Sequence, residues 1–252
     1  MDDKKINFYS VIIGTELLNG RRKDAHFSFL NTQLLMRGWE HKASFVIEDD
    51  TKLMFDIFNL IKSDPNSVMF CFGGIGATPD DYTRQTAAKS FTNDKMEFNE
   101  DSKSKIIRQF KDEAYPHRIN MAYLPIGAKL LKNIVNDVSG FYLEDKFFFT
   151  PGFPSMSQAM VIEALDKLYP KSQEKYKRVL TATCSENDLI DTMKKMPEHL
   201  DFSSLPKIFE NSRKVVISLA GYDDDEVDKY FQLFIDYCEK NQKEYILKDI
   251  NF

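Results

Sequence analysis

Two adjacent carboxylates, Asp80 and Asp81, follow a turn that holds three glycines within four residues, at positions 73–76 (Gly-Gly-Ile-Gly). An apolar run over residues 67–72 comes directly before the turn and is short enough to be a buried strand. A strand, a glycine turn and a helix start together form a common small-molecule site, because the backbone N–H groups there are unpaired and the helix dipole attracts anions. The pattern therefore predicts a binding site for a phosphorylated ligand at this turn.

The two aspartates indicate that the ligand is not a bare phosphate, because adjacent carboxylates repel one. They are expected instead to touch a bridging cation, a ribose or ring hydroxyl, or an activated water. Carboxylate oxygens suit Mg²⁺ or another hard divalent cation, and Co²⁺ and Mn²⁺ are further candidates. Glu16 follows the first predicted strand, so three carboxylates are expected to converge at the carboxyl edge of the sheet, where open α/β sheets bind ligands.

Each of these features also has a purely structural interpretation, which stays open at this point. Gly73, Gly74 and Gly76 permit positive φ and a close approach to the backbone, but a plain strand-to-helix turn uses glycine in the same way. Aspartates at a helix start offset its positive end by ~0.3–1 kcal/mol each. Asp80 and Arg84 are spaced i,i+4, as in a routine surface ion pair.

The elements that must position these residues follow a βαβαβα pattern in the first part of the chain. Predicted strands cover residues 6–13, 39–46 and 67–72, and predicted helices cover residues 25–36 and 51–61. This alternation predicts an α/β fold with a mostly parallel sheet and helices on both of its faces. A further helix is expected to begin with Thr78 as N-cap, Pro79 at N1 and the two aspartates at N2 and N3, and to end near Phe91.

The next stretch is less regular. Residues 100–113 favour a helix, and a proline and a glycine within residues 123–128 break the pattern. Short strands are predicted over residues 140–143 and 146–149, joined as a hairpin by Glu144 and Asp145. They lead into a second turn that contains Pro151 and Gly152, and a helix is expected from Ser155 to Leu168.

A composition shift over residues 169–175 predicts the domain boundary, with a larger α/β domain over residues 1–170 and a small α+β domain over residues 171–252. In the second part, strands are predicted over residues 176–184, 200–205, 214–220 and 245–247, and helices over residues 186–196 and 224–240. The order βαββαβ is that of a ferredoxin-like unit.

Composition excludes several classes of protein. The chain has 252 residues and a net charge of −5, so bulk electrostatics give no help to a nucleic-acid partner, and we expect none. No apolar run approaches the ~20 residues of a membrane span, so no membrane partner is expected. Cys71, Cys184 and Cys238 lie far apart in apolar or helical contexts, which predicts buried or free thiols and a reducing cytoplasm.

Five motifs stand in order along the first 170 residues, and together they resemble a known family. They are residues 14–20 (Gly-Thr-Glu-Leu-Leu-Asn-Gly), 73–84 (Gly-Gly-Ile-Gly-Ala-Thr-Pro-Asp-Asp-Tyr-Thr-Arg), 124–128 (Leu-Pro-Ile-Gly-Ala), 140–141 (Gly-Phe) and 151–154 (Pro-Gly-Phe-Pro). This set resembles the molybdopterin-binding (molybdenum-cofactor biosynthesis) domain in the form found in competence/damage-inducible protein A and its stand-alone relatives. The resemblance covers roughly residues 6–168, and the tail resembles the small second domain of the same relatives more weakly.

The resemblance implies a three-layer α/β/α core that often forms homo-oligomers, and a ligand pocket at the glycine turn. The pocket residues that it implies are Gly73, Gly74, Gly76, Thr78, Asp80, Asp81 and Thr83, with Gly14, Thr15, Glu16, Pro151 and Gly152 at the rim. In some relatives the pocket binds molybdopterin. In relatives of competence/damage-inducible protein A, the domain is associated with metal-dependent hydrolysis of ADP-ribose-type pyrophosphates.

The sequence also departs from the family pattern. Full-length competence proteins carry a further C-terminal amidohydrolase domain for nicotinamide mononucleotide, and we do not expect that activity here. The family's first motif often ends in an asparagine at a helix start, where this chain has Asp24, Ala25 and His26. His26 is either a site residue or, as we favour, a solvated residue at a helix N-terminus. The basic loop of residues 21–23 either holds phosphates or is simply solvated, and we favour solvation.

Two main function classes remain open from the sequence. The leading hypothesis is a divalent-cation-dependent hydrolase of a nucleotide pyrophosphate such as ADP-ribose, in which the glycine turn donates N–H groups to phosphate. In that hypothesis Asp80 and Asp81 hold the cation or position water, and Glu16 assists. The alternative is a non-catalytic binding module for molybdopterin, another pterin or a nucleotide. A structural oligomer with a vestigial pocket is a third interpretation.

Overall fold

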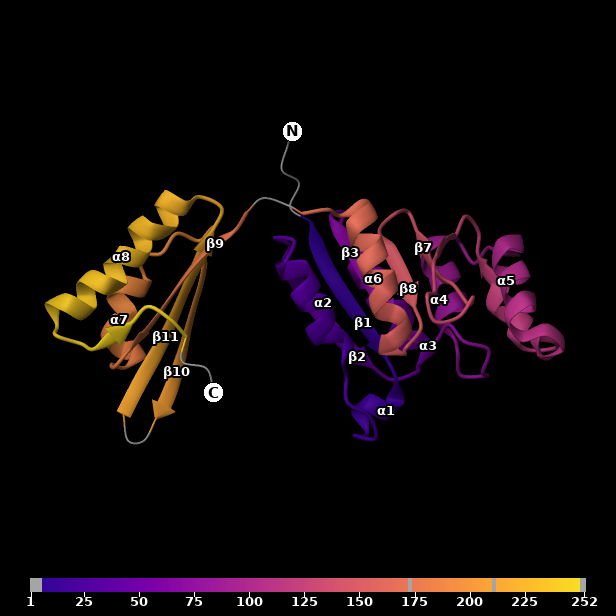
Figure 1. The fold of residues 1–252 in the computed structure, drawn as a ribbon, viewed down its shortest axis with the longest axis horizontal. Coiled ribbons are helices and arrows are strands. Elements are labelled where there is room, and N and C mark those ends of the chain that lie inside the picture. The colour runs from indigo at the N-terminus through magenta and orange to yellow at the C-terminus, as the bar shows by residue number, and fades with distance from the viewer. Residues whose placement is uncertain (1–5, 172–173, 210–211, 250–252) are drawn as a thin grey trace. The chain divides into compact units, whose positions relative to one another are not determined.

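The strands at the centre of the first unit are apolar on both sides, and this composition decides their place in the fold. In the computed structural model, which describes residues 6–171, 174–209 and 212–249, the chain divides into two units, residues 1–172 and 173–252. Figure 1 shows both units. The sequence places the boundary after residue 170.

The sheet of the first unit has the order β2-β1-β3-β8-β7-β6. Its strands are β1 (Asn7–Ile13), β2 (His41–Ile47), β3 (Ser67–Phe72), β6 (Lys129–Leu131), β7 (Gly140–Leu143) and β8 (Phe147–Thr150). The first four strands in this order are parallel, whereas β7 and β6 are antiparallel to their neighbours. The prediction of a mostly parallel α/β sheet is therefore confirmed. Glu144 and Asp145 turn the β7–β8 hairpin with φ of 53° and 55°, as a tight hairpin turn requires.

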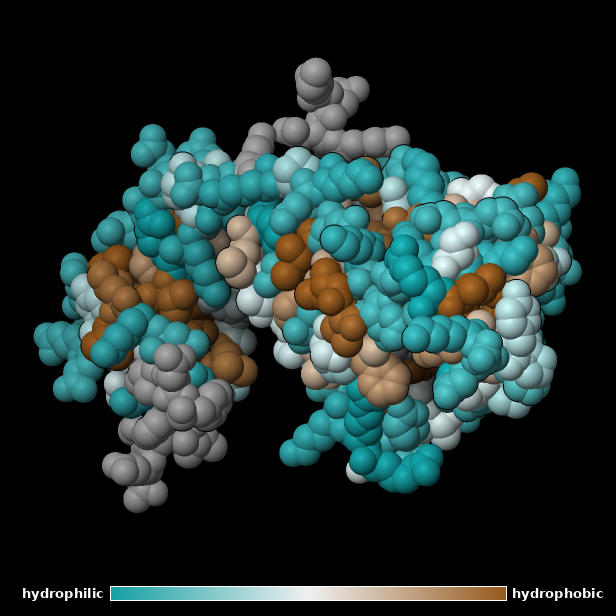
Figure 2. Space-filling view, turned by 45° about the vertical axis from the view of Figure 1, so that its right-hand side comes forward, coloured by the Kyte–Doolittle hydropathy of each residue, from teal (hydrophilic) through white to brown (hydrophobic). Residues whose placement is uncertain are grey.

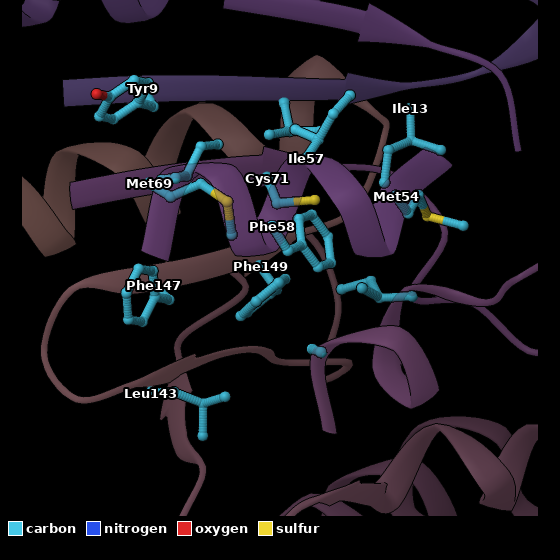
Figure 3. Close-up of a cluster of buried hydrophobic side chains, with 14 of the residues drawn as sticks. Tyr9, Ile13, Met54, Ile57, Phe58, Met69, Cys71, Leu143, Phe147 and Phe149 are labelled. Atoms are coloured by element: carbon cyan, nitrogen blue, oxygen red, sulfur yellow. The ribbon is translucent and has the colours of Figure 1, made fainter. Parts of the chain in front are cut away.

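Helices cover both faces of this sheet. Helices α2 (His26–Leu35) and α6 (Pro154–Leu168) pack on one face, over Phe8, Phe70 and Phe148, and they lie in front of the strands in Figure 1. Helices α3 (Thr51–Lys62) and α4 (Thr83–Phe91) pack on the other face. Figure 3 shows part of this second cluster, with Phe58 of α3 among strand side chains. Because neighbouring strand residues point to opposite faces, each strand supplies both clusters.

A small subdomain follows α4. It contains β4 (Met96–Phe98), α5 (Glu100–Phe110), the 3₁₀ helices η1 (Lys111–Ala114) and η2 (Arg118–Ala122), and β5 (Tyr123–Pro125). Strands β4 and β5 pair in an antiparallel manner, which places Phe98 beside Tyr123. The predicted helix over residues 100–113 is confirmed in its first three turns, and its last residues form η1.

Single side chains tie the end of α6 to the sheet. The Trp39 indole packs on Phe8, with ring centroids 5.6 Å apart, and its Nε1–H donates to the Tyr169 carbonyl at 3.3 Å. The Tyr169 hydroxyl in turn donates to the carbonyl of Asp145 at 2.6 Å. Trp39 is therefore fixed between the first strand and the last residues of the first unit.

The second unit has the predicted βαββαβ order. Its elements are β9 (Tyr176–Ala182), α7 (Glu186–Met193), β10 (Asp201–Phe209), β11 (Ser212–Gly221), α8 (Asp224–Lys240) and β12 (Tyr245–Ile246). The strands form an antiparallel sheet of order β10-β11-β9-β12, and α7 and α8 cover one face of it. On the other face, the Thr181 hydroxyl donates to the Lys248 carbonyl at 2.7 Å, so the segment after β12 crosses that face.

The cysteines are buried and free, as the sequence predicts. Burial raises the pKa of the thiols of Cys71, Cys184 and Cys238, so these groups are poor nucleophiles. Within the described residues, the helices are too short or too polar for any of them to cross a bilayer.

Candidate functional site

The glycine turn after β3 folds back onto the first residue of α4. Gly73 and Gly74 have φ of 104° and 67°, in the left-handed region. The Thr83 N–H donates to the Gly74 carbonyl at 3.0 Å, and the Thr83 hydroxyl donates to the Gly73 carbonyl at 3.0 Å. Thr83, predicted as a ligand contact, is fully buried and holds the turn in place.

Two of the glycines are required by close contacts. A Cβ on Gly74 would lie 2.2 Å from the Thr83 hydroxyl oxygen, in addition to its positive φ. A Cβ on Gly73 would lie 2.6 Å from the backbone carbonyl oxygen of Ile13, again with a positive φ, whereas a Cβ on Gly76 would meet only the Asp81 side chain, 2.5 Å from Oδ2. The turn is therefore compact because its side chains fold onto its backbone, and this leaves little room for any larger residue.

The N–H groups of Gly74, Gly76 and Ala77 find no acceptor among the residues that the structure describes. Gly74, Gly76 and Ala77 are all partly exposed. Free N–H groups in a glycine turn form a site for the oxygens of an anion. The turn therefore offers free donor groups, and phosphate binding by them stays a prediction.

The predicted start of the following helix is wrong. Helix α4 begins at Thr83 and has no side-chain cap, so Asp80 and Asp81 do not occupy its first turn. Instead, the Asp81 Oδ2 atom accepts from the Thr78 N–H at 2.7 Å and from the Thr78 hydroxyl at 2.5 Å. In this separate turn, the Asp81 carboxylate accepts from the polar groups of Thr78 that would otherwise cap a helix. The two hydrogen bonds from Thr83 to the glycine turn fix the start of α4 at Thr83.

The carboxylate of Asp80 is exposed beside this turn. The Thr78 hydroxyl and the backbone N–H of Asp80 itself lower the pKa of this carboxyl, so the group is ionised at neutral pH. Asp81 is partly exposed and keeps one carboxylate oxygen, Oδ1, outside its hydrogen bonds to Thr78. The chain therefore places two adjacent carboxylates next to the free N–H groups.

Arg84 is buried, with 5% of its surface exposed, and does not form the surface pair with Asp80 that its spacing suggests. Its Nη1 atom donates to the carbonyls of Ile75 and Gly76. Burial lowers the pKa of the guanidinium, and the charge of Asp81 opposes that effect. Arg84 thus fixes the carbonyl side of the glycine turn, which leaves the N–H side free.

A cavity of about 550 Å³ opens beside Thr78, Asp81 and Arg84. It is lined by Ala77, Thr78, Pro79, Asp81, Tyr82, Arg84, Gln85, Phe98, His117, Asn120 and Tyr123. The sequence predicted only Thr78 and Asp81 of these as site residues, and Gln85 and the last four residues lie outside every motif that it offered. The pairing of β4 with β5 brings Phe98 and Tyr123 together, and both strands, of three residues each, are too short to be recognised from periodicity.

The end of β1 carries the predicted rim residues Gly14, Thr15 and Glu16. The Gly14 N–H donates to the Ile47 carbonyl at 3.0 Å. Both the N–H and the hydroxyl of Thr15 donate to the Asp49 Oδ2 atom, at 2.9 Å and 2.8 Å. The donors of Gly14 and Thr15 are therefore used within the fold.

Glu16 lies 3.6 Å from the Arg22 guanidinium, between the carboxylate Oε1 and Nη1 atoms. Within the described residues, no three side chains of His, Cys, Asp or Glu gather in a group that could hold a metal ion. The expected convergence of Glu16 with Asp80 and Asp81 on one cation is therefore absent. Mg²⁺ commonly binds through one or two carboxylates together with substrate phosphates and water, and the pair Asp80 and Asp81 fits that mode.

The second glycine turn, after β8, lies against the first. A Cβ on Gly152 would lie 3.3 Å from the Cα of Gly73. The Gly152 carbonyl accepts from Arg22 Nη2 at 2.8 Å and from His26 Nε2 at 3.2 Å. Pro151 precedes Gly152, and α6 begins at Pro154. Because proline has no backbone N–H, both residues reduce the number of free donors in this turn.

His26 is buried, so the favoured interpretation of a solvated residue is wrong. Its ring stacks on Phe72 with centroids 4.5 Å apart, and its Nδ1 atom accepts from the Ser157 hydroxyl at 3.3 Å. Burial is the main cause that lowers the pKa of His26, and the Gly152 carbonyl and Asp24 oppose it. His26 and Arg22 thus hold the second turn, and neither is simply solvated.

Comparison with known proteins assigns the first unit to one family. A family model described as "Probable molybdopterin binding domain" matches residues 10–170. A protein of Caldivirga maquilingensis is 28% identical over 235 residues, which cover 87% of this chain and 90% of that protein. A CinA-like protein of Fusobacterium nucleatum is 29% identical over 190 residues, which cover 73% of this chain and 46% of that protein.

Solved structures agree on the fold. A crystal structure of the protein CinA from Thermoplasma acidophilum, described as having unknown function, matches with a TM-score of 0.58 and 25% identity. The match covers 66% of this chain and 98% of that chain. The chain spans less than half the length of the CinA-like relatives from Sulfurihydrogenibium and Fusobacterium, 44% and 46%.

Proposed function

Because this chain belongs to the molybdopterin-binding domain family and has CinA-like relatives, we propose that its glycine turn binds the phosphate groups of a nucleotide or a pterin. The observation that carries this proposal is the set of free N–H groups at Gly74, Gly76 and Ala77, beside a cavity of about 550 Å³. Such donors favour phosphate oxygens, and the volume lies in the range of small-molecule sites.

We further propose that the site hydrolyses a nucleotide pyrophosphate such as ADP-ribose with the help of a divalent cation. The specific support is the ionised, exposed Asp80 next to the partly free carboxylate of Asp81. A bound cation would supply Lewis-acid polarisation of a phosphoryl oxygen. Asp80 and Asp81 would hold it, the N–H groups of the turn would orient the phosphates, and Arg84 would keep the turn rigid.

The test is hydrolysis of ADP-ribose by the purified chain with Mg²⁺, Mn²⁺ or Co²⁺. Asp80→Asn and Asp81→Asn are expected to lower the rate about 100-fold or more, because each removes one anionic oxygen ligand. Glu16→Gln shows whether the carboxylate at the neighbouring strand end assists. Asp191→Asn, at an exposed position of α7, is the control and should keep full activity. No turnover with any of the three cations would reject hydrolysis.

A second candidate function is binding of molybdopterin or another pterin without catalysis. The specific observation in its favour is that no group of three metal-ligating side chains forms within the described residues. Thermal-shift measurements with pterins and nucleotides, with and without metal, separate the two functions, because a ligand that binds only the native state raises its stability. A shift with pterin that does not depend on metal supports the binding module. Oligomer formation stays a prediction, which light scattering of the purified chain would measure.

A further inference from the structure

Beyond the phosphate end of the site, we propose that Tyr82, Phe98 and Tyr123 form a stacking subsite for a flat heteroaromatic ring on the same ligand. The inference rests on the proposed phosphate binding, because the ring and the phosphates would belong to one molecule. The three aromatic residues line the cavity next to Thr78, Asp81 and Arg84. The ligand class is therefore a phosphorylated purine or pterin and not a sugar phosphate alone.

Exposure of the three aromatic side chains is the first observation. Tyr82, Phe98 and Tyr123 are 39%, 47% and 40% exposed, although they come from three different elements. Apolar side chains such as Leu35, Met36 and Leu60 are exposed elsewhere, and Figure 2 shows that hydrophobic residues reach the surface in separate patches. Single exposed apolar residues are ordinary, but three aromatic side chains around one cavity are a feature of ligand sites.

The arrangement of the aromatic wall is the second observation. Phe98 and Tyr123 are paired residues of β4 and β5, and their ring centroids lie 5.1 Å apart at an interplanar angle of 50°. The wall therefore has a fixed backbone on one side of the cavity, and Tyr82 comes from the loop before α4. A rigid aromatic wall can stack on a flat ring at a small cost in conformational entropy.

Polar groups complete the cavity. Gln85, His117 and Asn120 line it, and the side chains of Gln85 and Asn120 make no hydrogen bond to any other described residue. Amide and imidazole groups can donate to or accept from the edge of a heterocycle, which carbohydrates and aliphatic ligands do not present. Arg84 also lines the cavity, and its cationic group favours an anionic ligand there.

Calorimetric titration with a set of ligands tests the subsite. ADP-ribose, AMP and a phosphorylated pterin carry both a ring and a phosphate, whereas ribose 5-phosphate and pyrophosphate carry no ring. Phe98→Ala and Tyr123→Ala should each weaken the ring-bearing ligands by about 10- to 100-fold, the usual effect of one lost stacking contact. Ribose 5-phosphate and pyrophosphate should bind as they do to the unmodified chain.

Controls make the outcome decisive. Tyr222→Ala removes an exposed aromatic residue of the second unit, outside the cavity, and should change no affinity. Tyr123→Leu keeps apolar packing and removes only the ring, so it serves if Tyr123→Ala fails to fold. Unchanged affinity for ring-bearing ligands in Phe98→Ala and Tyr123→Leu would overturn the subsite and leave phosphate binding intact. If no phosphorylated ligand binds the unmodified chain, both proposals are overturned. If the ring-bearing ligands bind, comparing the affinity of the purine nucleotides with that of the phosphorylated pterin identifies the ring.

Discussion

The turn after β3 and the turn after β8 lie in contact at the carboxyl edge of one sheet, with Gly152 against Gly73. Both turns combine glycine with proline and precede a helix. In the first turn, the N–H groups of Gly74, Gly76 and Ala77 have no acceptor within the described residues, and the exposed Asp80 carboxylate has only local partners, the Thr78 hydroxyl and its own N–H. In the second turn, the Gly152 carbonyl accepts two hydrogen bonds, from Arg22 and His26.

Glycine and proline alone therefore do not separate a binding turn from a structural turn. The first motif has three glycines with Asp80 and Asp81 close behind them, whereas the second has one glycine, whose carbonyl is held by Arg22 and His26. What separates them is which side chains the fold brings to each turn, the carboxylates of Asp80 and Asp81 at the first and the donors Arg22 and His26 at the second. Substitutions in and beside both turns test this distinction through the free energy of unfolding.

Gly74→Ala should have the largest effect. The left-handed φ costs ~1–2 kcal/mol for a residue with a side chain. The new Cβ would also meet the Thr83 hydroxyl at 2.2 Å and displace its hydrogen bond to Gly73, so we expect a total loss of about 3 kcal/mol in urea denaturation. Gly20→Ala is the matched control, because its φ is 77° and nothing lies within 4 Å of the new Cβ. Equal losses in both variants would show that the contact with Thr83 is unimportant.

Arg84→Met should have the next largest effect. It leaves the buried Ile75 carbonyl and the Gly76 carbonyl without a donor, so the loss should be about 2 kcal/mol, and phosphate binding should weaken. Arg22→Met in the second turn should lose about 1 kcal/mol or less, because His26 still donates to Gly152. Differential scanning calorimetry compares the two variants. A larger loss for Arg22→Met would reverse the roles assigned to the two turns.

His26→Gln tests the second turn through pH. Burial holds the folded-state pKa of His26 below its ordinary value of 6.5, so the unfolded chain binds the proton more tightly. The contribution of neutral His26 to the free energy of unfolding should therefore be fully present above about pH 6.5. It should fall as the pH drops below that value, by at most ~1.4 kcal/mol per pH unit. Denaturation monitored by circular dichroism should show a shallower slope in His26→Gln.

His41→Gln is the matched control for the pH experiment. Burial lowers the pKa of His41 as well, so His41 contributes its own part of the acid slope. Each substitution should remove part of the slope and the double substitution more than either. An acid slope that is the same in His26→Gln and in the unmodified chain would mean that His26 takes up a proton without leaving its place against Gly152.

Asp80→Ala should have the smallest effect on stability. The carboxylate is exposed, so the melting temperature should not change, although cation-dependent binding should be lost. Asp24→Ala, beside the second turn, should cost about 1 kcal/mol, because the Asp24 carboxylate accepts from the N–H groups of His26 and Phe27 at the start of α2. A lower melting temperature for Asp80→Ala would mean that the first turn uses this carboxylate structurally.

The sequence was sufficient where structure follows from local pattern. Apolar strands such as Ser67–Phe72 and the amphipathic helix Asp224–Lys240 were predicted because burial on one or both faces leaves a periodic signal. The glycine motif was also recognised correctly as the turn at the sheet edge. These features depend on residues that are close together in the chain.

The rest depends on contacts between distant residues. The residues from Thr78 to Asp81 fit the sequence rules for a helix start and for a separate turn equally well. The hydrogen bonds from Thr83 to the Gly73 and Gly74 carbonyls select the separate turn. His26 appeared solvated because Gly152 and Ser157, which surround it, lie more than 120 positions away in the chain. The aromatic wall likewise exists only after Phe98 pairs with Tyr123.

Trp39 has a practical consequence. It is the single tryptophan of the 252 residues, and it is held between Phe8 and the Tyr169 carbonyl in the first unit. Its intrinsic fluorescence therefore reports on the unfolding of the first unit without contribution from the second. Comparing fluorescence with circular dichroism, which averages over the helices and strands of both units, separates the two unfolding steps in the intact chain without any engineered label.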